Sequence, residues 1–347
     1  MLAIIVHSLS RVGGTESVVK LLANNLSTKM KVFVIETEKS EYKKSVCDQF
    51  EVVNVSSSFK NEKINMVLSM LNARKYIIRH SIHNIYSTFG NLNLLSILYF
   101  RGRNVIVCDH LCYQMSMRGP FGYLRKKAYK YASWVVSLTE KDVPNYIGDG
   151  DRCVVIENPL DEHKIYNGNF ERNDFIAVGR LCFQKNYERM IDIFSYICKV
   201  DSSLRLNIFG NGDQDYIDKI LNEIKDRKLV DNVFLHKATD NIGEWLSRSK
   251  LLIMTSHYEG LPMVLIEAQA NGLPCAALDV QTGPSDIIVN RDVGLLMDSG
   301  LSNEVIAEMI LDYYSEITNE NSNAACLNSK RYSVAPVIRK WLEILDA

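Results

Sequence analysis

Two glutamates with seven residues between them, Glu259 and Glu267, offer carboxylates on either side of a predicted helix start. The apolar run 250–255 predicts a strand. Pro262 stands where the first turn of a helix should follow, a position that suits its fixed φ and missing N–H. Backbone N–H groups at a helix start attract anions. We therefore expect an anion-binding loop formed by the residues that join strand to helix: Gly260, Leu261, Pro262 and Met263.

The two carboxylates also have plainer explanations. Glu259 could be a helix-capping acid, and Glu267 could lie on a solvated helix face. Paired glutamates also serve glycosidases as an acid and a base. One glutamate in a loop and one along a helix suit the two ends of a single ligand better than the two sides of a glycosidic oxygen. The spacing therefore favours transfer over hydrolysis.

Two cations, Arg180 and Lys185, follow another predicted strand at 174–179. Paired loop cations are often only solvated. At the carboxyl edge of the same sheet, however, they would flank a diphosphate, with Arg180 as a fork of donors and Lys185 as a point charge. Each charge-assisted contact is worth ~1.5–3 kcal/mol. Because the chain has neither a DxD pair at a strand end nor a His/Cys metal spacing, we expect a site that needs no metal and no other cofactor.

Short apolar runs alternate with segments of helical period along the whole chain. This rhythm predicts an α/β protein with two doubly wound, Rossmann-like domains whose parallel sheets are covered on both faces. Ligands of such folds bind outside the carboxyl ends of the strands, so we expect the active site in a cleft between the domains. The predicted strands span residues 2–7, 31–36, 51–55, 83–88, 104–108, 134–138 and 153–157 in the first half, and 174–179, 204–209, 232–236, 250–255, 274–279 and 293–297 in the second.

The pattern breaks at 158–159, where Asn-Pro is followed by a polar stretch. This break places a first domain at 1–165 and a second domain at 166–330. The remaining residues, 331–347, contain an amphipathic segment. We expect that C-terminal helix to cross back onto the first domain.

The composition excludes several classes of protein. Of 347 residues, 47% are hydrophobic and 23% are charged, which is typical of a folded soluble chain. The apolar runs fall well short of the ~20 residues that cross a bilayer, and the N-terminus carries no basic segment or cleavage site, so we expect a cytoplasmic protein with reduced cysteines. Residues 1–165 carry 22 Lys+Arg against 15 Asp+Glu, whereas the remainder carries 18 against 26. The two halves should therefore meet different partners.

Five motifs stand in an order typical of one enzyme family. They are the glycine loop at 8–16, Gly179-Arg180 followed by Lys185, Gly210-Asn211-Gly212, Glu259 with Glu267, and Gly283-Pro284-Ser285-Asp286-Ile287-Ile288. Together they resemble the retaining nucleotide-sugar glycosyltransferases of the GT-B fold, family 4, or glycosyl transferases group 1, of the type that builds bacterial polysaccharides and lipid-linked oligosaccharides. The likeness covers nearly the whole chain and is most specific from 176 to 290.

The resemblance implies that the second domain binds the nucleotide sugar. Glu267 would accept hydrogen bonds from the ribose hydroxyls, and Glu259 would lie beside the donor sugar, near the transferred carbon. Arg180 and Lys185 would hold the diphosphate, helped by the backbone amides of 260–263. Negative charge grows on the departing nucleotide diphosphate, so fixed donors aimed at it would lower the barrier.

Other residues are carried over from the family more loosely. Gly13 and Gly14 would reach the diphosphate from the first domain. His110 would lie near the sugar, although a lone histidine is more often structural. The base pocket would be lined by Gly210, Gly212, Lys237 and Ala238.

The activity implied by the resemblance is transfer of a sugar, with retention, to a lipid-linked saccharide acceptor in surface polysaccharide biosynthesis. Family frequency favours a UDP-linked hexose or N-acetylhexosamine as the donor. Two alternatives stay open: a nucleotide-sugar epimerase or hydrolase of the same fold, and a non-catalytic two-domain sugar-binding protein. A nicotinamide oxidoreductase is disfavoured, because Gly210-Asn211-Gly212 follows a strand but lacks the third glycine.

The acceptor side is predicted from residues 118–131, which hold five cations, no acid and several aromatic residues. Such a basic, aromatic helix can lie on an anionic membrane surface, here the inner face of the cytoplasmic membrane. Arg74, Lys75, Arg79 and His80 could extend the patch. The alternative is a solvated helix whose tyrosines pack inward, and no nucleic-acid module is recognisable. The cations of the segment are Arg118, Arg125, Lys126, Lys127 and Lys130.

Overall fold

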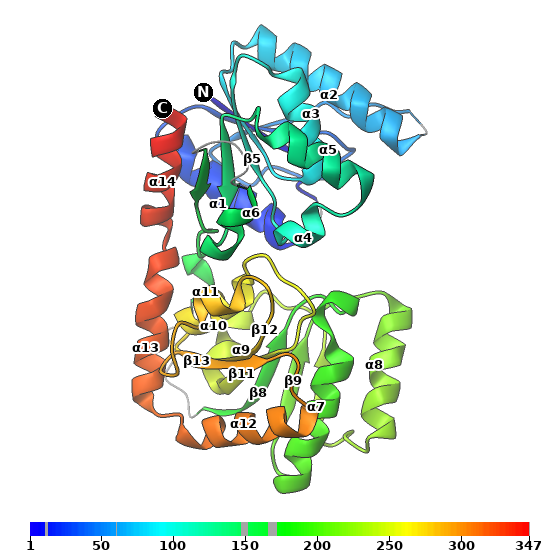
Figure 1. Ribbon diagram of the computed structural model, residues 1–347, viewed down its shortest axis with the longest axis vertical. Coiled ribbons are helices and arrows are strands. Elements are labelled where there is room, and N and C mark those ends of the chain that lie inside the picture. The colour runs from blue at the N-terminus through cyan, green and yellow to red at the C-terminus, as the bar shows by residue number, and fades with distance from the viewer. Residues whose placement is uncertain (11–12, 60, 147–151, 166–171, 347) are drawn as a thin grey trace. The chain divides into compact units, whose positions relative to one another are not determined.

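The computed structural model of the protein describes residues 1–10, 13–59, 61–146, 152–165 and 172–346. The chain forms two compact units (Figure 1). Unit 1 comprises Met1–Pro159 and Val334–Ala347, and unit 2 comprises Leu160–Ser333. Unit 1 carries 23 Lys+Arg against 15 Asp+Glu, and unit 2 carries 17 against 26. The opposite charges of the two halves therefore belong to two separately folded bodies.

Unit 1 is built on a seven-stranded parallel sheet with the order β3-β2-β1-β4-β5-β6-β7. The interior strand β1 is buried along its whole length, because helices cover both faces of the sheet. The strands are β1 (Leu2–Val6), β2 (Val32–Glu36), β3 (Glu51–Asn54), β4 (Asn84–Ser87), β5 (Asn104–Cys108), β6 (Trp134–Ser137) and β7 (Cys153–Val155). The helices are α1 (Gly14–Ser27), α2 (Glu62–Arg79), α3 (Gly90–Tyr99), α4 (Tyr113–Ser116), α5 (Gly119–Tyr129), α6 (Val143–Tyr146) and α14 (Val334–Asp346).

Unit 2 repeats the design on a six-stranded parallel sheet with the order β10-β9-β8-β11-β12-β13. Its core includes the fully buried rings of Phe175 and Phe194. The strands are β8 (Asn173–Val178), β9 (Leu206–Phe209), β10 (Val233–His236), β11 (Ser249–Met254), β12 (Cys275–Asp279) and β13 (Gly294–Asp298). The helices are α7 (Tyr187–Val200), α8 (Gln214–Asp226), α9 (Ile242–Arg248), α10 (Met263–Ala270), α11 (Pro284–Ile287), α12 (Asn303–Glu316) and α13 (Asn319–Ser329).

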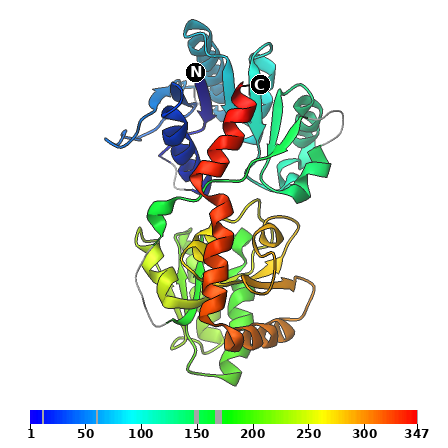
Figure 2. The ribbon, with the colours of Figure 1, turned by 90° about the vertical axis from the view of Figure 1, so that its left-hand side faces the viewer.

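The last helix, α14, returns to unit 1. Its Trp341 packs against Tyr86 of β4 with ring centroids 4.5 Å apart, and Asn84 Nδ2 donates to the Leu345 carbonyl at 3.1 Å. Figure 2 shows this red helix lying along α1, at the side of the sheet. The amphipathic pattern thus reflects an apolar face that unit 1 buries.

The boundaries between the units differ by a few residues from those expected at 165 and 330. The chain passes between the units at Pro159 and again at Val334. The Leu160 N–H donates to the Tyr332 carbonyl at 2.7 Å, which ties the two crossing segments together at the edge of unit 2. Residues 166–171 of the polar linker expected after 159 lie outside the described residues.

Candidate active site

The loops after β8 and β11 lie at the point where the strand order of unit 2 reverses. From β8 the chain runs outward to β9 and β10 on one side, and then returns to β11 on the other. Loops that leave the carboxyl ends of such neighbouring strands diverge and open a crevice where ligands bind. The two predicted motifs, 179–186 and 255–262, therefore stand side by side although about 70 residues separate them in sequence.

Lys185 and Glu259 form an ion pair across these two loops. Lys185 Nζ lies 2.6 Å from Glu259 Oε1, and their side chains are only 17% and 8% exposed. Such a pair is costly to desolvate and is stabilising only when each charge keeps its partner. The short contact therefore fixes both groups at the carboxyl edge of the sheet.

Backbone and side-chain hydrogen bonds hold the two loops in register. The His257 N–H donates to the Gln184 carbonyl at 2.8 Å, and Gln184 Nε2 donates to the Tyr258 carbonyl at 3.0 Å. Thr255 Oγ1 donates to the Asn186 carbonyl at 3.0 Å. Asn186 itself adopts a left-handed conformation (φ 52°) that ends the short 3-10 turn Phe183–Lys185. The position of Lys185 is thus set by the backbone of both loops.

Arg180 is the second predicted cation, and its surroundings differ from those of Lys185. Its side chain is exposed. Within the described ranges it makes no hydrogen bond or ion pair, so its guanidinium is available to a ligand.

The loop before α10 is supported from behind by the segment at 282–284. Thr282 Oγ1 donates to the Glu259 carbonyl at 2.8 Å. Gly283 has a φ of +96°, and a Cβ there would lie 2.5 Å from the Gly260 carbonyl oxygen and from Pro262 Cδ. This close approach explains why glycine precedes Pro284 in the predicted motif.

The start of α10 presents fewer donors than the sequence suggested. Pro262 precedes the helix in an extended conformation and has no N–H, which leaves the amides of Gly260, Leu261 and Met263. The helix ends at Ala270, and Gly272 follows with a left-handed φ of +68°. Glu267 is the fifth residue of this helix and is half-buried.

Gly210 and Gly212 have a steric role that spacing did not indicate. A Cβ on Gly210 would lie 2.0 Å from the Gly179 carbonyl oxygen, and one on Gly212 would lie 2.2 Å from that of Leu181. The Leu181 N–H donates to the Asn211 carbonyl at 2.8 Å, so the two segments extend the sheet beyond β8 and β9. These glycines let the arginine-bearing loop lie against its neighbour.

The predicted base-pocket residues Lys237 and Ala238 are exposed next to this glycine segment. The Ala238 N–H donates to Asn211 Oδ1 at 3.1 Å, which fixes the loop after β10. The lining of a base pocket by these residues stays a prediction.

Two aromatic residues beside the ion pair were missed by the sequence analysis. Phe183 is 67% exposed and stacks on His257, with ring centroids 4.5 Å apart and an interplanar angle of 26°. Both residues lie in the loops that the motifs had singled out. Both aromatic residues were therefore visible within the motifs, but their separation in sequence did not show that the two rings stack.

In unit 1, His110 follows β5 as predicted and is held by a buried tyrosine. The Tyr86 hydroxyl and His110 Nε2 are 3.3 Å apart, and Nδ1 is shielded from solvent with no hydrogen-bond partner among the described residues. Burial lowers the pKa of His110 to about 4. The imidazole is therefore neutral at neutral pH, and it can exchange hydrogen bonds but does not supply a positive charge.

Acid should destabilise unit 1 through His110. Burial lowers its pKa from 6.5 to about 4. Below pH 6.5 the unfolded chain binds a proton that the folded chain refuses, so this contribution to stability is complete above pH 6.5 and is lost as the pH falls toward 4. The loss reaches at most about 1.4 kcal/mol per pH unit. Urea denaturation of wild type and His110→Asn at pH 7, 6 and 5 should show a flatter pH dependence in the variant. Parallel pH dependences would contradict the assignment.

The residue before this histidine, Asp109, anchors helix α5 to the sheet. Tyr129 of α5 donates its hydroxyl hydrogen to Asp109 Oδ2 at 2.8 Å, and Asn93 Nδ2 approaches Oδ1 at 3.2 Å. Burial raises the pKa of this carboxyl, although the hydrogen bonds oppose that shift. The network fixes α5 relative to the strand end that carries His110.

The cations of 118–131 do not form one surface. The Arg125 guanidinium lies over Gly90, where an added Cβ would be 2.2 Å from Nη1, and it donates to Asn91 Oδ1 at 3.4 Å. Arg125 therefore contributes to the α3–α5 packing and is half-buried, and its role toward a membrane or an acceptor stays a prediction. The outward cations are Arg118, Lys126, Lys127 and Lys130.

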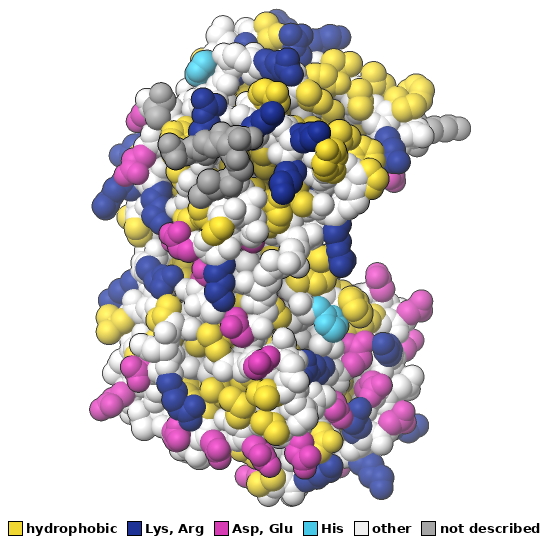
Figure 3. Space-filling view, viewed as in Figure 1, with side chains coloured by type: hydrophobic (Ala, Val, Ile, Leu, Met, Phe, Trp, Pro, Cys, Tyr) yellow, Lys and Arg dark blue, Asp and Glu magenta, His cyan; other side chains and the backbone are white. Residues whose placement is uncertain are grey.

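Large apolar side chains lie among these outward cations. Phe121, Tyr123 and Leu124 are 54%, 59% and 50% exposed. Figure 3 shows hydrophobic and basic side chains side by side on the part of unit 1 that carries α2, α3 and α5. Tyrosines of this segment are divided: Tyr129 packs inward, whereas Tyr123 points to solvent. We call the surface formed by Arg118, Phe121, Tyr123, Leu124, Lys126, Lys127 and Lys130 the α5 face.

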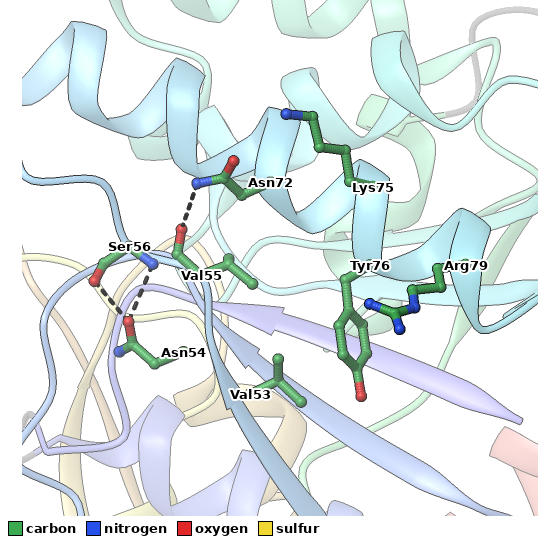
Figure 4. A pocket seen from close by; sticks show the side chains of 8 residues that line it. All are labelled: Val53, Asn54, Val55, Ser56, Asn72, Lys75, Tyr76 and Arg79. Atoms are coloured by element: carbon green, nitrogen blue, oxygen red, sulfur yellow. Dashed lines mark hydrogen bonds between the residues drawn. The ribbon is translucent and has the colours of Figure 1, made fainter.

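A second basic feature of unit 1 lies between the end of β3 and helix α2. Figure 4 shows Lys75, Tyr76 and Arg79 on one side of a cavity of about 410 Å³, with Val53 and Val55 on the other. The two cations are one helical turn apart and exposed. They add to the positive charge of unit 1 but belong to a different place from the α5 face.

The glycine loop near the N-terminus is described only in part. Gly13 precedes α1 in an extended conformation (φ −168°), and Gly14 is the first residue of that helix. A Cβ on Gly14 would meet no atom within 4 Å. Arg11 and Val12 lie outside the described residues. The reach of Gly13 and Gly14 toward a diphosphate stays a prediction.

Two further features of the chain concern metals and membranes. Among the described residues, no group of three or more His, Cys, Asp or Glu side chains could hold a metal ion. Over the same residues, none of the helices is both long enough and apolar enough to span a bilayer.

Comparison with known proteins identifies the family. The family model for glycosyl transferases group 1 matches residues 128–326, which is more than half of the chain. The strand orders, the paired loops at the reversal point and this match agree with one another. The chain belongs to the glycosyl transferases group 1, and its two parallel α/β units match the structures of GT-B glycosyltransferases.

Its relatives include glycosyltransferases of polysaccharide biosynthesis. The amylovoran biosynthesis glycosyltransferase AmsD of Erwinia amylovora is 30% identical over 365 residues, with 99% of each protein covered. The poly(ribitol-phosphate) alpha-N-acetylglucosaminyltransferase of Staphylococcus aureus strain COL is 30% identical over 242 residues, which span 64% of this chain and 47% of that enzyme. The structure of Anabaena HepE in complex with UDP and glucose has a TM-score of 0.82 at 16% identity, with 100% of this chain and 99% of that chain covered. That last likeness concerns the fold alone.

Proposed function

We propose that this chain is a retaining glycosyltransferase of family 4 that moves a sugar from a nucleotide diphosphate sugar to a lipid-linked saccharide in surface polysaccharide biosynthesis. The single observation that carries the proposal is the enclosed Lys185–Glu259 pair at the reversal point of the unit 2 sheet, with Arg180 free to bind beside it. UDP is the favoured nucleotide, because a structural neighbour, HepE, binds UDP and glucose. The donor sugar would be a hexose or an N-acetylhexosamine.

The arrangement suits stabilisation of a leaving diphosphate. Negative charge grows on the diphosphate as its bond to the sugar breaks, and fixed donors that meet this charge lower the barrier. Lys185 is already oriented by Glu259 and by two backbone loops, so little reorganisation is needed when the charge develops. Arg180 supplies a planar fork that fits phosphate oxygens. The carboxylate of Glu259 would lie near the transferred carbon, and Glu267 would accept hydrogen bonds from the ribose.

We propose that the transfer needs no metal ion. Two cations and the first amides of α10 neutralise the same charge that a divalent ion would neutralise in other transferases. Activity should accordingly persist in the presence of a chelator. Loss of turnover with EDTA, restored by a divalent ion, would overturn this part of the proposal.

The proposal is tested by finding the donor. A panel of nucleotide sugars is first screened by thermal shift, and donors that stabilise the protein are then assayed for slow hydrolysis without acceptor and for transfer to membrane lipid extracts. We expect one donor to give both hydrolysis and transfer. NMR of the product should show that the anomeric configuration is retained. An epimer formed without acceptor would favour the epimerase alternative. Tight binding of free sugar without turnover would favour the sugar-binding alternative.

The α5 face is proposed to hold the enzyme at the anionic inner face of the cytoplasmic membrane, where a lipid-linked acceptor would lie. Exposed aromatic and cationic side chains on one helix are typical of helices that bind at membrane interfaces. Each cation near such a surface contributes about 1 kcal/mol of attraction, and the effect is screened by salt. The exposed Phe121 and Leu124 would enter the headgroup region.

Removing three lysines of the α5 face should weaken membrane binding. At about 1 kcal/mol per cation, the triple alanine variant of Lys126, Lys127 and Lys130 should partition roughly 100-fold less onto phosphatidylglycerol-containing vesicles. Sedimentation at low salt measures the change. A matched control replaces three exposed lysines of other surfaces, Lys199, Lys225 and Lys330. Equal loss in both triple variants, or no loss in either, would contradict the proposal.

A further inference from the structure

We propose that Phe183 and His257 form a platform on which the acceptor saccharide stacks a sugar ring beside the transfer site. This inference deepens the proposed function and rests on it. The two rings are stacked at 4.5 Å, and Phe183 is 67% exposed. An exposed phenylalanine on a tightly held loop is costly to keep in water, and binding of an apolar surface removes that cost.

The platform is rigid because its backbone is fixed on both sides. The His257 N–H donates to the Gln184 carbonyl at 2.8 Å, one residue beyond Phe183. Gln184 Nε2 in turn donates to the Tyr258 carbonyl at 3.0 Å. Little conformational freedom is therefore lost when a ligand settles on the rings, which favours weak ligands such as saccharides.

The platform is also close to the proposed chemistry. Phe183 precedes Lys185 by two residues, and His257 precedes Glu259 by two. At 3.8 Å per residue, each ring is attached within about 8 Å of a backbone position that carries a member of the ion pair. The ion pair is enclosed whereas Phe183 faces solvent, so the platform lies at the accessible margin of the proposed site.

The chemistry of the two rings selects the ligand. The face of an aromatic ring carries partial negative charge, and the axial C–H groups on one face of a pyranose carry partial positive charge, so the two faces attract. The imidazole of His257 covers one face of Phe183 and leaves the other face of the phenyl ring to a pyranose. A nucleobase offers a π-face instead, and it is the competing occupant that the experiment must distinguish.

The experiment measures saccharide and nucleotide binding separately. Saturation-transfer difference NMR with lactose, cellobiose and isomaltose detects weak pyranose binding, and calorimetry measures UDP affinity. Phe183→Ala should lower the saturation transfer to pyranose C–H protons at least fivefold and leave UDP affinity unchanged within twofold. Phe183→Tyr should keep the wild-type signal. The matched control is Val200→Ala, which trims an exposed apolar side chain (74% exposed) at the end of α7.

Three outcomes would overturn the platform. The first is a wild-type protein that binds none of the three disaccharides. The second is equal saturation transfer in wild type and Phe183→Ala. The third is a loss of UDP affinity in Phe183→Ala, which would make the rings a nucleobase site. Failure of the proposed function looks different: UDP would not bind to wild type, while disaccharide binding would still depend on Phe183.

Discussion

Replacing Lys185 with alanine is expected to lower kcat by about 10²–10³-fold, because loss of one preorganised donor to a developing negative charge costs that much in comparable sites. The effect should fall on turnover more than on donor KM, since the charge that Lys185 meets grows in the transition state. Steady-state kinetics with the donor found by screening measures both constants. Turnover within threefold of wild type would contradict the role of Lys185.

The same substitution should also lower stability, which separates Lys185 from Arg180. Without Lys185, the 8%-exposed carboxylate of Glu259 is left without its partner, at a cost of about 1–3 kcal/mol in the free energy of unfolding. Arg180→Ala removes an exposed side chain, so it should lower kcat with little change in stability. The double variant Lys185→Met, Glu259→Gln should recover stability without recovering activity. Recovery of activity in that variant would show that the pair serves folding alone.

The fold was predictable because of how parallel sheets are built. Strands buried on both faces need continuous apolar runs. Turn residues at both ends limit runs such as 104–108 and 250–255 to the length of a strand, which indicates buried strands. All thirteen predicted strands are confirmed, within two residues at each end. The GT-B expectation followed from the strand–helix rhythm and the motif order together.

The contacts inside the site were not predictable in the same way. Lys185 and Glu259 are 74 residues apart, and nothing in either loop encodes the relative position of β8 and β11. The steric need for Gly210 depends likewise on a carbonyl of another strand. Local pattern fixed which residue types stand at strand ends, and tertiary packing decided which of them touch.

Arg125 illustrates a packing contact that the sequence pattern did not show. Gly122, Arg125 and Tyr129 lie three and four residues apart, so they share one face of α5. Gly122 packs against the Met117 carbonyl and Tyr129 bonds to Asp109, which makes that face the inner one. Lys126 has the same spacings to Gly122 and Tyr129, so helical phase does not separate the two cations; the contact of Arg125 with Gly90 and Asn91 of α3 does.

Replacing Glu267 with alanine is expected to raise the donor KM by about 30–100-fold with little change in kcat. Two hydrogen bonds from ribose hydroxyls to a carboxylate should together contribute about 2–3 kcal/mol, and each 1.4 kcal/mol is a tenfold change. The nucleotide end does not change charge during transfer, so the ground state and the transition state lose this binding equally. This split between KM and kcat is the opposite of that expected for Lys185.

A 2′-deoxyribose donor makes the Glu267 test specific. Wild type should discriminate against the deoxy donor by at least tenfold, whereas Glu267→Ala should treat both donors alike, because the group that reads the hydroxyl is gone. Glu308→Ala, which removes an exposed carboxylate from α12, is the matched control and should keep the discrimination. Discrimination that survives in Glu267→Ala would place ribose recognition elsewhere. The two donors differ only in that hydroxyl. A general loosening of α10 would therefore weaken the binding of both donors equally and would leave the discrimination between them unchanged.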